Sequence, residues 1–156
     1  MKIAVFSDTH GDISGIRLIE RDLPPLDAVF HLGDFSSDGA EIGEYLHVPC
    51  YAVRGNCDYR GWDSVPSERI VELGGARFFL THGHRYRSTY ELGLAAEEAH
   101  CGTVLFGHTH EPLLTAFGHV LIVNPGSLSR PRGGTNPGYA LLTVENGDVS
   151  VKMISI

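Results

Sequence analysis

The chain contains 156 residues, of which 42% are hydrophobic and 20% are charged, and its formal net charge at pH 7 is -7. This length and composition are typical of one folded domain, and they exclude both a disordered chain and a membrane span of about 20 apolar residues. The negative charge argues against stable binding to nucleic acid or to anionic membranes, because such binding needs clustered Lys and Arg.

The first half of the chain alternates patterns of strand and helix. Apolar, β-rich runs predict strands at residues 2–7, 27–34 and 49–56, and apolar residues at helical spacing predict helices at 13–23 and 41–46. Strands that alternate with helices are typical of parallel βαβ units. We therefore predict a parallel sheet in this half.

The second half contains mostly strand patterns. Residues 69–84 predict a hairpin that turns at Gly74 and Gly75, and residues 88–100 predict one more helix with Ser88 as its N-cap. Strands separated by Gly, Asn and Pro are then predicted at 103–107, 113–118, 120–124, 139–147 and 149–156, with a surface loop at 129–138. The sequence thus predicts one α/β domain over residues 1–156 that contains two packed sheets.

Side chains that commonly bind metal ions follow the predicted strands. The carboxyl ends of parallel strands converge at one edge of an α/β sheet, where ligands bind. Each such residue alone has a simpler interpretation, such as a turn residue or a helix N-cap, but recurrence at five strand ends favours a shared site. The residues are Asp8, His10, Asp34, Asn56, His82, His84, His108 and His110.

Two metal ions suit this pattern. Ions that share a site need an anionic ligand that bridges them, and Asp34, which stands alone at its strand end, is the best candidate. One ion would take Asp8, His10 and Asp34, and the other would take Asp34, Asn56 and a later histidine. The neutral amide of Asn56 limits the negative charge, which suits a site that must attract a phosphate anion.

The segment GHTH supplies two histidines two positions apart. On an extended segment His108 and His110 would point to opposite faces, so the pair could not easily chelate one ion. If a strand ends at Phe106 and Gly107 opens a turn, each histidine can serve a different ion. Mutation of either histidine is then expected to weaken a different metal position.

Six short motifs together resemble a known family. The motifs are DTH (8–10), GD (33–34), GNCD (55–58), THGH (81–84), GHTH (107–110) and NPGS (124–127). In this order the first five resemble the motifs of calcineurin-like metallophosphoesterases. GNCD and NPGS are shared with the small phosphodiesterases of the YfcE and MJ0936 type, which the chain resembles most closely. The resemblance spans nearly the whole chain. It implies the metallo-dependent phosphatase fold, a four-layer αββα sandwich with two mixed β-sheets.

The resemblance also implies a binuclear centre that hydrolyses small phosphoester substrates through a hydroxide bridging the two ions. The first ion would be held by Asp8, His10, Asp34 and His110. The second ion would be held by Asp34, Asn56, His82 and His108. Mn²⁺ is the leading expectation, with Ni²⁺, Fe²⁺ and Zn²⁺ as alternatives, because mixed nitrogen and oxygen ligands accept several first-row ions.

Four residues are candidates for catalysis: Asp34, Asn56, Cys57 and His84. Asp34 and Asn56 belong to the expected binuclear centre, whereas His84 would support a ligand or contact the substrate. In larger relatives a histidine follows the Asn and protonates the leaving group, but here that position is Cys57, a weaker acid. This departure favours leaving groups that depart unprotonated, such as aryl phosphates, or His84 as another donor.

Further polar residues have less direct assignments. Arg54, Arg130 and Arg132 are candidates for gripping a phosphate oxygen, although exposed loop arginines are the common alternative. Asp58 is expected either to orient a ligand or to form a turn. The histidines outside the motifs are expected to be structural: His31, His47, His100 and His119.

Location, assembly and an alternative function complete the expectations. The three cysteines form no CxxC pair, which indicates a reduced protein. The N-terminal apolar run is too short for a signal peptide, so the expected location is the cytoplasm. Small members of the family often pair, so a homodimer is expected. The main alternative is a non-catalytic metal-binding scaffold of the retromer-subunit type, and another is a single-metal hydrolase or storage protein. All seven predicted ligand positions are filled, which favours catalysis.

Overall fold

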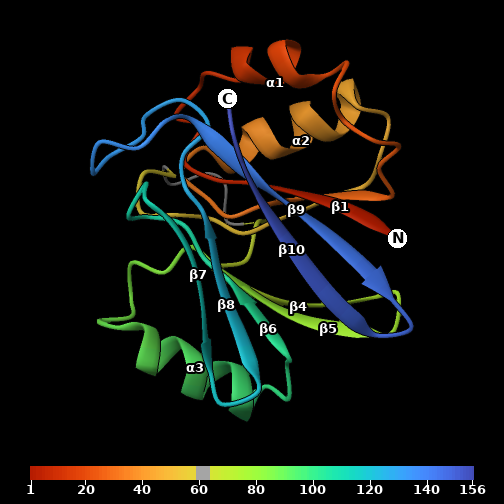
Figure 1. The fold of residues 1–156 in the computed structure, drawn as a ribbon. Helices are drawn as coiled ribbons and strands as arrows, with labels where there is room; N and C mark the ends of the chain where they lie inside the picture. Colours follow the sequence, from red (N-terminus) through yellow and green to blue (C-terminus); the bar gives the residue numbers. More distant parts are fainter. Residues whose placement is uncertain (59–63) are drawn as a thin grey trace.

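Two five-stranded β-sheets pack face to face in the computed structural model, which describes residues 1–58 and 64–156 (Figure 1). The first sheet has the order β10-β9-β1-β2-β3, with β1, β2 and β3 parallel and β9 and β10 antiparallel. Its strands are β1 Lys2–Phe6, β2 Ala28–His31, β3 Cys50–Ala52, β9 Gly138–Glu145 and β10 Asp148–Ser155. β1 lies in the middle and is buried on both faces, which explains its unbroken apolar run.

The second sheet has the order β4-β5-β6-β8-β7, with β5, β6 and β8 parallel and an antiparallel strand at each edge. Its strands are β4 Glu68–Leu73, β5 Ala76–Thr81, β6 Thr103–Leu105, β7 Pro112–Phe117 and β8 Val120–Pro125. The predicted hairpin is confirmed as β4–β5, because Leu73 pairs with Ala76 across Gly74 and Gly75. Both sheets are therefore mixed, with parallel strands at their centres.

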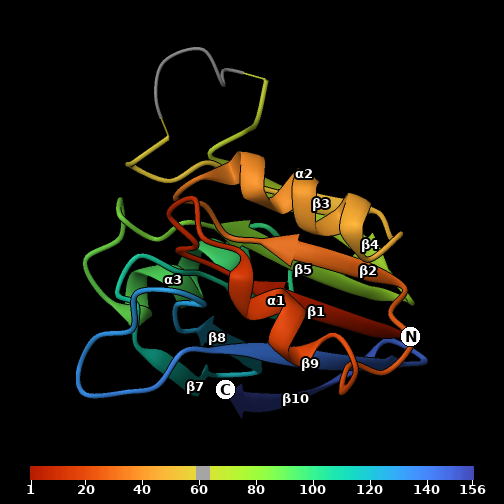
Figure 2. The same ribbon diagram turned by 90° about the horizontal axis from the view of Figure 1, so that it is seen from above.

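Three helices of the described chain cover the outer faces of the two sheets (Figure 2). The helices are α1 Ser14–Ile19, α2 Ser36–Tyr45 and α3 Thr89–Glu98. Apolar side chains of α1 and α2 pack on the first sheet, and those of α3 pack on the second. A third cluster, which includes the edge-to-face pair Phe30 and Phe78, fills the space between the sheets. This arrangement confirms the predicted four-layer αββα sandwich.

The boundaries of the first two helices differ from the prediction. α2 begins at Ser36 rather than near residue 41, because Gly39 and Gly43, poor helix formers in isolation, allow the helix to lie close to the sheet. A Cβ atom at Gly39 would lie 2.6 Å from His31. α1 ends at Ile19, and Leu23, predicted on the helix, lies in the turn before Pro24. By contrast, Ser88 caps α3 as predicted by accepting a hydrogen bond from the Glu91 amide.

None of the helices in residues 1–58 and 64–156 is long and apolar enough to cross a membrane.

Candidate metal centre

The carboxyl ends of five parallel strands carry the predicted ligand residues to one edge of the sandwich. Asp8 and His10 follow β1, Asp34 follows β2, and Asn56 follows β3. The later histidines follow β5 and β6 of the second sheet. The two sheets therefore contribute side chains from opposite sides of the same centre.

Four of these residues form a compact group, which we call the first ligand set: Asp8, His10, Asp34 and His110. Each of them offers an oxygen or nitrogen atom, and these atoms all lie within 4.8 Å of one another. His110 Nε2 lies 3.1 Å from Asp8 Oδ1 and 3.3 Å from His10 Nε2, and His10 Nε2 lies 3.6 Å from Asp34 Oδ2. Such a group can hold a divalent cation.

The first ligand set fits a metal ion because its buried charges are incompletely paired. Asp8 is fully buried, yet its Oδ1 atom has no hydrogen-bond partner among the described residues. The other oxygen, Oδ2, accepts hydrogen bonds from the Ser7 hydroxyl and from the His108 amide. A buried carboxylate oxygen without a partner is costly unless a cation binds it. This oxygen lies 3.1 Å from His110 Nε2, an ion-pair contact that an ion between the two atoms would replace.

We call the residues predicted to hold a second ion the second ligand set: Asp34, Asn56, His82 and His108, of which Asp34 also belongs to the first set. His82 Nε2 lies 3.3 Å from Asp34 Oδ1 and 3.1 Å from Asn56 Oδ1. Its other nitrogen, Nδ1, donates to the Leu32 carbonyl at 2.7 Å, so Nε2 is left as the ligand atom. The His108 ring is 5.3 Å from the His82 ring. Asp34 therefore lies between the two sets, as a bridging ligand must.

Five of the seven predicted ligands have a left-handed backbone, which non-glycine residues rarely adopt. The residues and their φ angles are Asp8 (54°), His10 (49°), Asp34 (52°), His108 (69°) and His110 (61°). This strain is concentrated where side chains must leave the strand ends and converge, as is common at functional sites. It also agrees with the expected alternative for GHTH, in which the strand ends before Gly107 and a turn rather than strand alternation orients both histidines.

Two glycines allow the loops of the centre to approach closely. A Cβ atom at Gly55 would lie 2.2 Å from Asp34 Oδ1, and one at Gly107 would lie 1.9 Å from the Ser7 hydroxyl. Both distances are far below contact distance for real Cβ atoms. The glycines in the motifs GNCD and GHTH are thus required by packing against the carboxylates.

The carboxylates of the centre remain ionised in the folded protein. Burial would raise the pKa of Asp34, but the hydrogen bond and charge of His82 and the Cys57 amide outweigh it and lower that pKa. Burial of Asp8 is likewise outweighed by His110, His82 and Ser7, which lower its pKa. Two negative charges are therefore held beside each other, which favours a cation between them.

The histidines of the two sets respond to these charges differently. The nearby Asp8 carboxylate raises the pKa of His110; for His82, burial acts to lower the pKa, but Asp34 and Asp8 outweigh it and raise the value. Burial lowers the pKa of both His10 and His108. Because a metal binds neutral imidazole, it must displace a proton most often from His82 and His110.

Cys57 and His84, the two candidates for proton transfer, lie beside the second ligand set. Burial, followed by the nearby Asp34, raises the pKa of Cys57 to about 11, so the thiol is an even weaker acid than its sequence suggests. The His84 ring lies 5.4 Å from the His82 ring and 6.1 Å from the His108 ring, and its buried Nδ1 has no hydrogen-bond partner among the described residues. The geometry thus favours His84 over Cys57 as a proton donor.

The motif NPGS braces the centre, a role that its sequence alone did not predict. The Asn124 amide donates to the Gly107 carbonyl at 2.8 Å and to the Thr109 hydroxyl at 3.0 Å, which fixes the backbone on both sides of His108. The Ser127 hydroxyl donates to the Asp8 carbonyl at 2.7 Å. Polar residues directly after a buried strand were the available signal.

Asp58 and His31 also support the centre from outside. Asp58 accepts hydrogen bonds from Ser36 and from the Gly55 amide, so it ties the loop after β3 to the start of α2. Buried His31 contacts the Thr9 hydroxyl and accepts a hydrogen bond from the Gly33 amide. Asp58 therefore orients the loop after β3. The contacts of His31 are structural, because they join the loops after β1 and β2.

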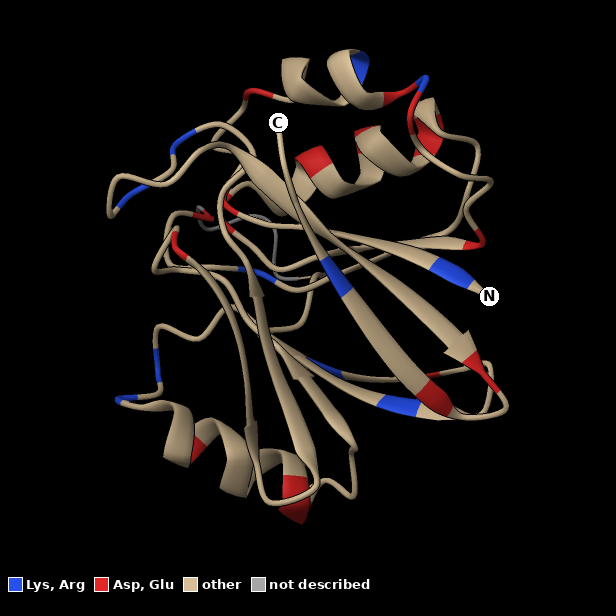
Figure 3. Ribbon diagram, viewed as in Figure 1, with Lys and Arg blue, Asp and Glu red and all other residues tan. Residues whose placement is uncertain are grey.

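Basic side chains surround this acidic centre. Figure 3 shows arginines on the loops at the left of the view, where the parallel strands end. The charge of Arg132 contributes to lowering the pKa of His108, and Arg130 acts similarly on His10. His110 also donates to the Arg130 carbonyl at 2.6 Å. The loop at 129–138 is thus attached to the first ligand set.

A two-sheet sandwich with carboxylates and imidazoles at the ends of its parallel strands is characteristic of metal-dependent phosphatases. The chain belongs to the calcineurin-like phosphoesterase superfamily, whose domain model matches residues 1–147. Phosphodiesterase MJ0936 of Methanocaldococcus jannaschii is 34% identical over 81% of this chain and 83% of its own. The predicted resemblance to small phosphodiesterases is confirmed, and it supports a phosphoesterase hydrolase.

Solved structures agree with this assignment. A conserved predicted phosphoesterase of Streptococcus pneumoniae has a TM-score of 0.81 and 31% identity over 99% of this chain and 88% of its own. Zinc-bound Vps29 of Entamoeba histolytica has a TM-score of 0.78 and 19% identity over 99% of this chain and 98% of its own. At that identity the second likeness concerns the fold alone.

Proposed function

We propose that this protein is a phosphodiesterase whose two ligand sets each hold one divalent metal ion. The observation that carries the proposal is Asp34, which directs one oxygen toward the first set and the other toward the second. When bound, divalent ions activate water and neutralise charge on the phosphoryl group. The expected assignment is Asp8, His10, Asp34 and His110 for one ion, and Asp34, Asn56, His82 and His108 for the other.

The chain's own residues supply the remaining requirements of hydrolysis. Asp8 and Asp34 stay ionised, and Asn124 and Ser127 hold the loops of the centre in place. Burial and the positive charge of neighbouring groups lower the pKa of His84, so the ring is mostly neutral near pH 7 and would donate a proton only after a bound substrate anion raises that pKa. Cys57 is assigned no proton transfer, because its pKa is raised to about 11.

Hydrolysis of bis(p-nitrophenyl) phosphate by the metal-loaded protein tests this proposal. We expect release of nitrophenol with added Mn²⁺, none after treatment with chelator, and a loss of at least about 10²-fold for His10→Ala. His119→Ala, at an exposed histidine far from the motifs, is the matched control and should retain full activity. Absence of hydrolysis with any of Mn²⁺, Ni²⁺, Fe²⁺ or Zn²⁺ would instead favour the non-catalytic scaffold of the Vps29 type.

We propose that residues 1–156 form one metallophosphoesterase domain that acts in the cytoplasm as a homodimer, with Mn²⁺ as the preferred ion and no stable binding to nucleic acid. The match to residues 1–147 and the net charge of -7 support the domain and the lack of nucleic acid binding, respectively. Metal analysis of protein purified without added metal, together with light scattering, tests the ion and the dimer.

A further inference from the structure

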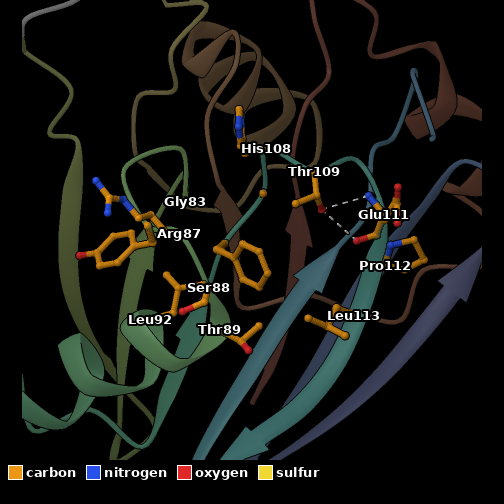
Figure 4. A pocket seen from close by; sticks show the side chains of 13 residues that line it. Gly83, Arg87, Ser88, Thr89, Leu92, His108, Thr109, Glu111, Pro112 and Leu113 are labelled. Atoms are coloured by element: carbon orange, nitrogen blue, oxygen red, sulfur yellow. Dashed lines mark hydrogen bonds between the residues drawn. The ribbon is translucent and has the colours of Figure 1, made fainter. Parts of the chain in front are cut away.

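A cavity of about 310 Å³ opens beside the second ligand set (Figure 4). It lies between the start of α3, the loop that follows β6, and the first residues of β7. His108 lies at one end, and Leu92, Thr89 and Leu113 lie at the other. Because His108 lines the cavity and also belongs to the second ligand set, the cavity is a direct neighbour of that set.

The walls of the cavity are apolar at the bottom and charged at the rim. Leu92 and Phe106 are almost fully buried, and Tyr86 adds a second aromatic ring to the lining. The charged residues of the lining, Arg87 and Glu111, are both exposed. A charged group placed at the bottom would lose water without gaining a partner, so the cavity suits an uncharged group.

We infer that this cavity binds an uncharged aromatic ester group of the substrate. The inference rests on the proposed function, because the phosphate must be held at the metal centre for its ester group to reach the cavity. The volume lies at the lower end of the range for ligand pockets, enough for a ring system and far more than a methyl group needs. Rings also pack well against Phe106 and Tyr86. The substrate class is thus aryl or similarly ring-bearing phosphoesters.

Binding of two phosphonates to metal-loaded protein tests the inference by isothermal titration calorimetry. Phenylphosphonate should bind about tenfold or more tightly than methylphosphonate, because its ring leaves water for an apolar cavity. Leu113→Trp fills the cavity and should remove this preference while leaving methylphosphonate affinity unchanged, which also shows that the variant is folded. Leu114→Trp, at the next and more exposed position of β7, does not line the cavity and should keep the preference.

A second filling variant, Thr89→Trp, approaches the cavity from the exposed start of α3 and should act like Leu113→Trp if that variant does not fold. Equal affinity of the unchanged protein for both phosphonates, or a preference that survives filling, overturns the inference and leaves the proposed function standing. If neither phosphonate binds metal-loaded protein, the proposed function itself fails and the inference falls with it.

Discussion

The two ligand sets of the centre differ in charge and in burial although they share Asp34. The first set combines two carboxylates with two imidazoles, and Asp8, Asp34 and His110 are nearly inaccessible to solvent. The second set has one carboxylate, two imidazoles and the amide of Asn56, which is exposed. The first set therefore places more negative charge in a less hydrated environment.

This difference indicates unequal metal affinities. A cation in the first set gains from two carboxylates, of which Asp8 has an oxygen without a hydrogen-bond partner among the described residues. A cation in the second set depends more on neutral ligands and keeps access to water through Asn56. We expect the first ion to be retained during purification and the second to exchange with solvent.

The largest expected effect follows from Asp34→Asn, which tests whether the sets are linked. The amide has lost the charge that both ions would share, so each set should lose affinity and hydrolysis of bis(p-nitrophenyl) phosphate should fall by about 10³-fold or more, equivalent to about 4 kcal/mol. Asp38→Asn is the matched control: Asp38 is also buried but donates no atom to either set, and its oxygen accepts from Gly11. A loss of affinity confined to one of the two ions would contradict a shared carboxylate.

Gly55→Ala tests how tightly the loop after β3 fits against Asp34. The new Cβ would lie 2.2 Å from Asp34 Oδ1, so the loop must shift, and we expect a loss of about 3 kcal/mol in the free energy of unfolding. Gly102→Ala provides the control, because a Cβ there meets nothing within 4 Å. Chemical denaturation of both variants measures the effect, and equal stabilities would show that the approach is not tight.

Acid should destabilise the metal-free protein through His31, which supports the loops that carry Asp8 and Asp34. Burial lowers the pKa of His31 to about 4, so the folded state binds this proton less readily than the unfolded state does. Stability from this residue is complete above pH 6.5 and is lost as the pH falls toward 4, by about 3 kcal/mol in total.

The matching measurement compares unfolding in chelator for the unchanged protein and for His31→Gln. The difference between their free energies of unfolding should shrink or reverse as the pH falls from 6.5 to 4, because glutamine does not titrate. His119→Gln, at an exposed position, should follow the unchanged protein throughout. Parallel curves for all three proteins would mean that His31 does not remain neutral when folded.

The smallest effects come from the braces, which act on different sets. Ser127→Ala removes the hydrogen bond to the Asp8 carbonyl and should weaken binding of the first ion by about 10- to 100-fold. Asn124→Ala frees the backbone on both sides of His108 and should weaken the second ion by a similar factor. Competition with a fluorescent chelator measures both affinities. Weaker binding of the same ion in both variants would show that the two braces do not act on different ligand sets.

Much of this architecture can be predicted from sequence because the chain follows local rules. Ser88 caps α3, and Gly74 and Gly75 turn the β4–β5 hairpin, since both signals depend on neighbouring residues. The start of α2 was missed because its glycines are explained by contacts with the sheet rather than by helix propensity.

The candidate site shows the same division. Ligand-type residues at strand ends predicted the convergence of both sheets, whereas the left-handed backbone of His108 and His110 was not predicted. That conformation is stabilised by tertiary contacts, including those of Asn124, which the local sequence does not reveal, although histidine adopts it more often than most non-glycine residues. The brace by Ser127 likewise spans 119 positions of sequence.

Metal stoichiometry in three proteins tests the two-set account most directly. Equilibrium dialysis against Mn²⁺ followed by metal analysis should give about two ions per chain for the unchanged protein. His110→Ala and His108→Ala should each retain one ion, with the ion that remains in His108→Ala held more tightly because it occupies the first set. One ion per chain in the unchanged protein with full activity, or loss of the same ion in both variants, would contradict the account.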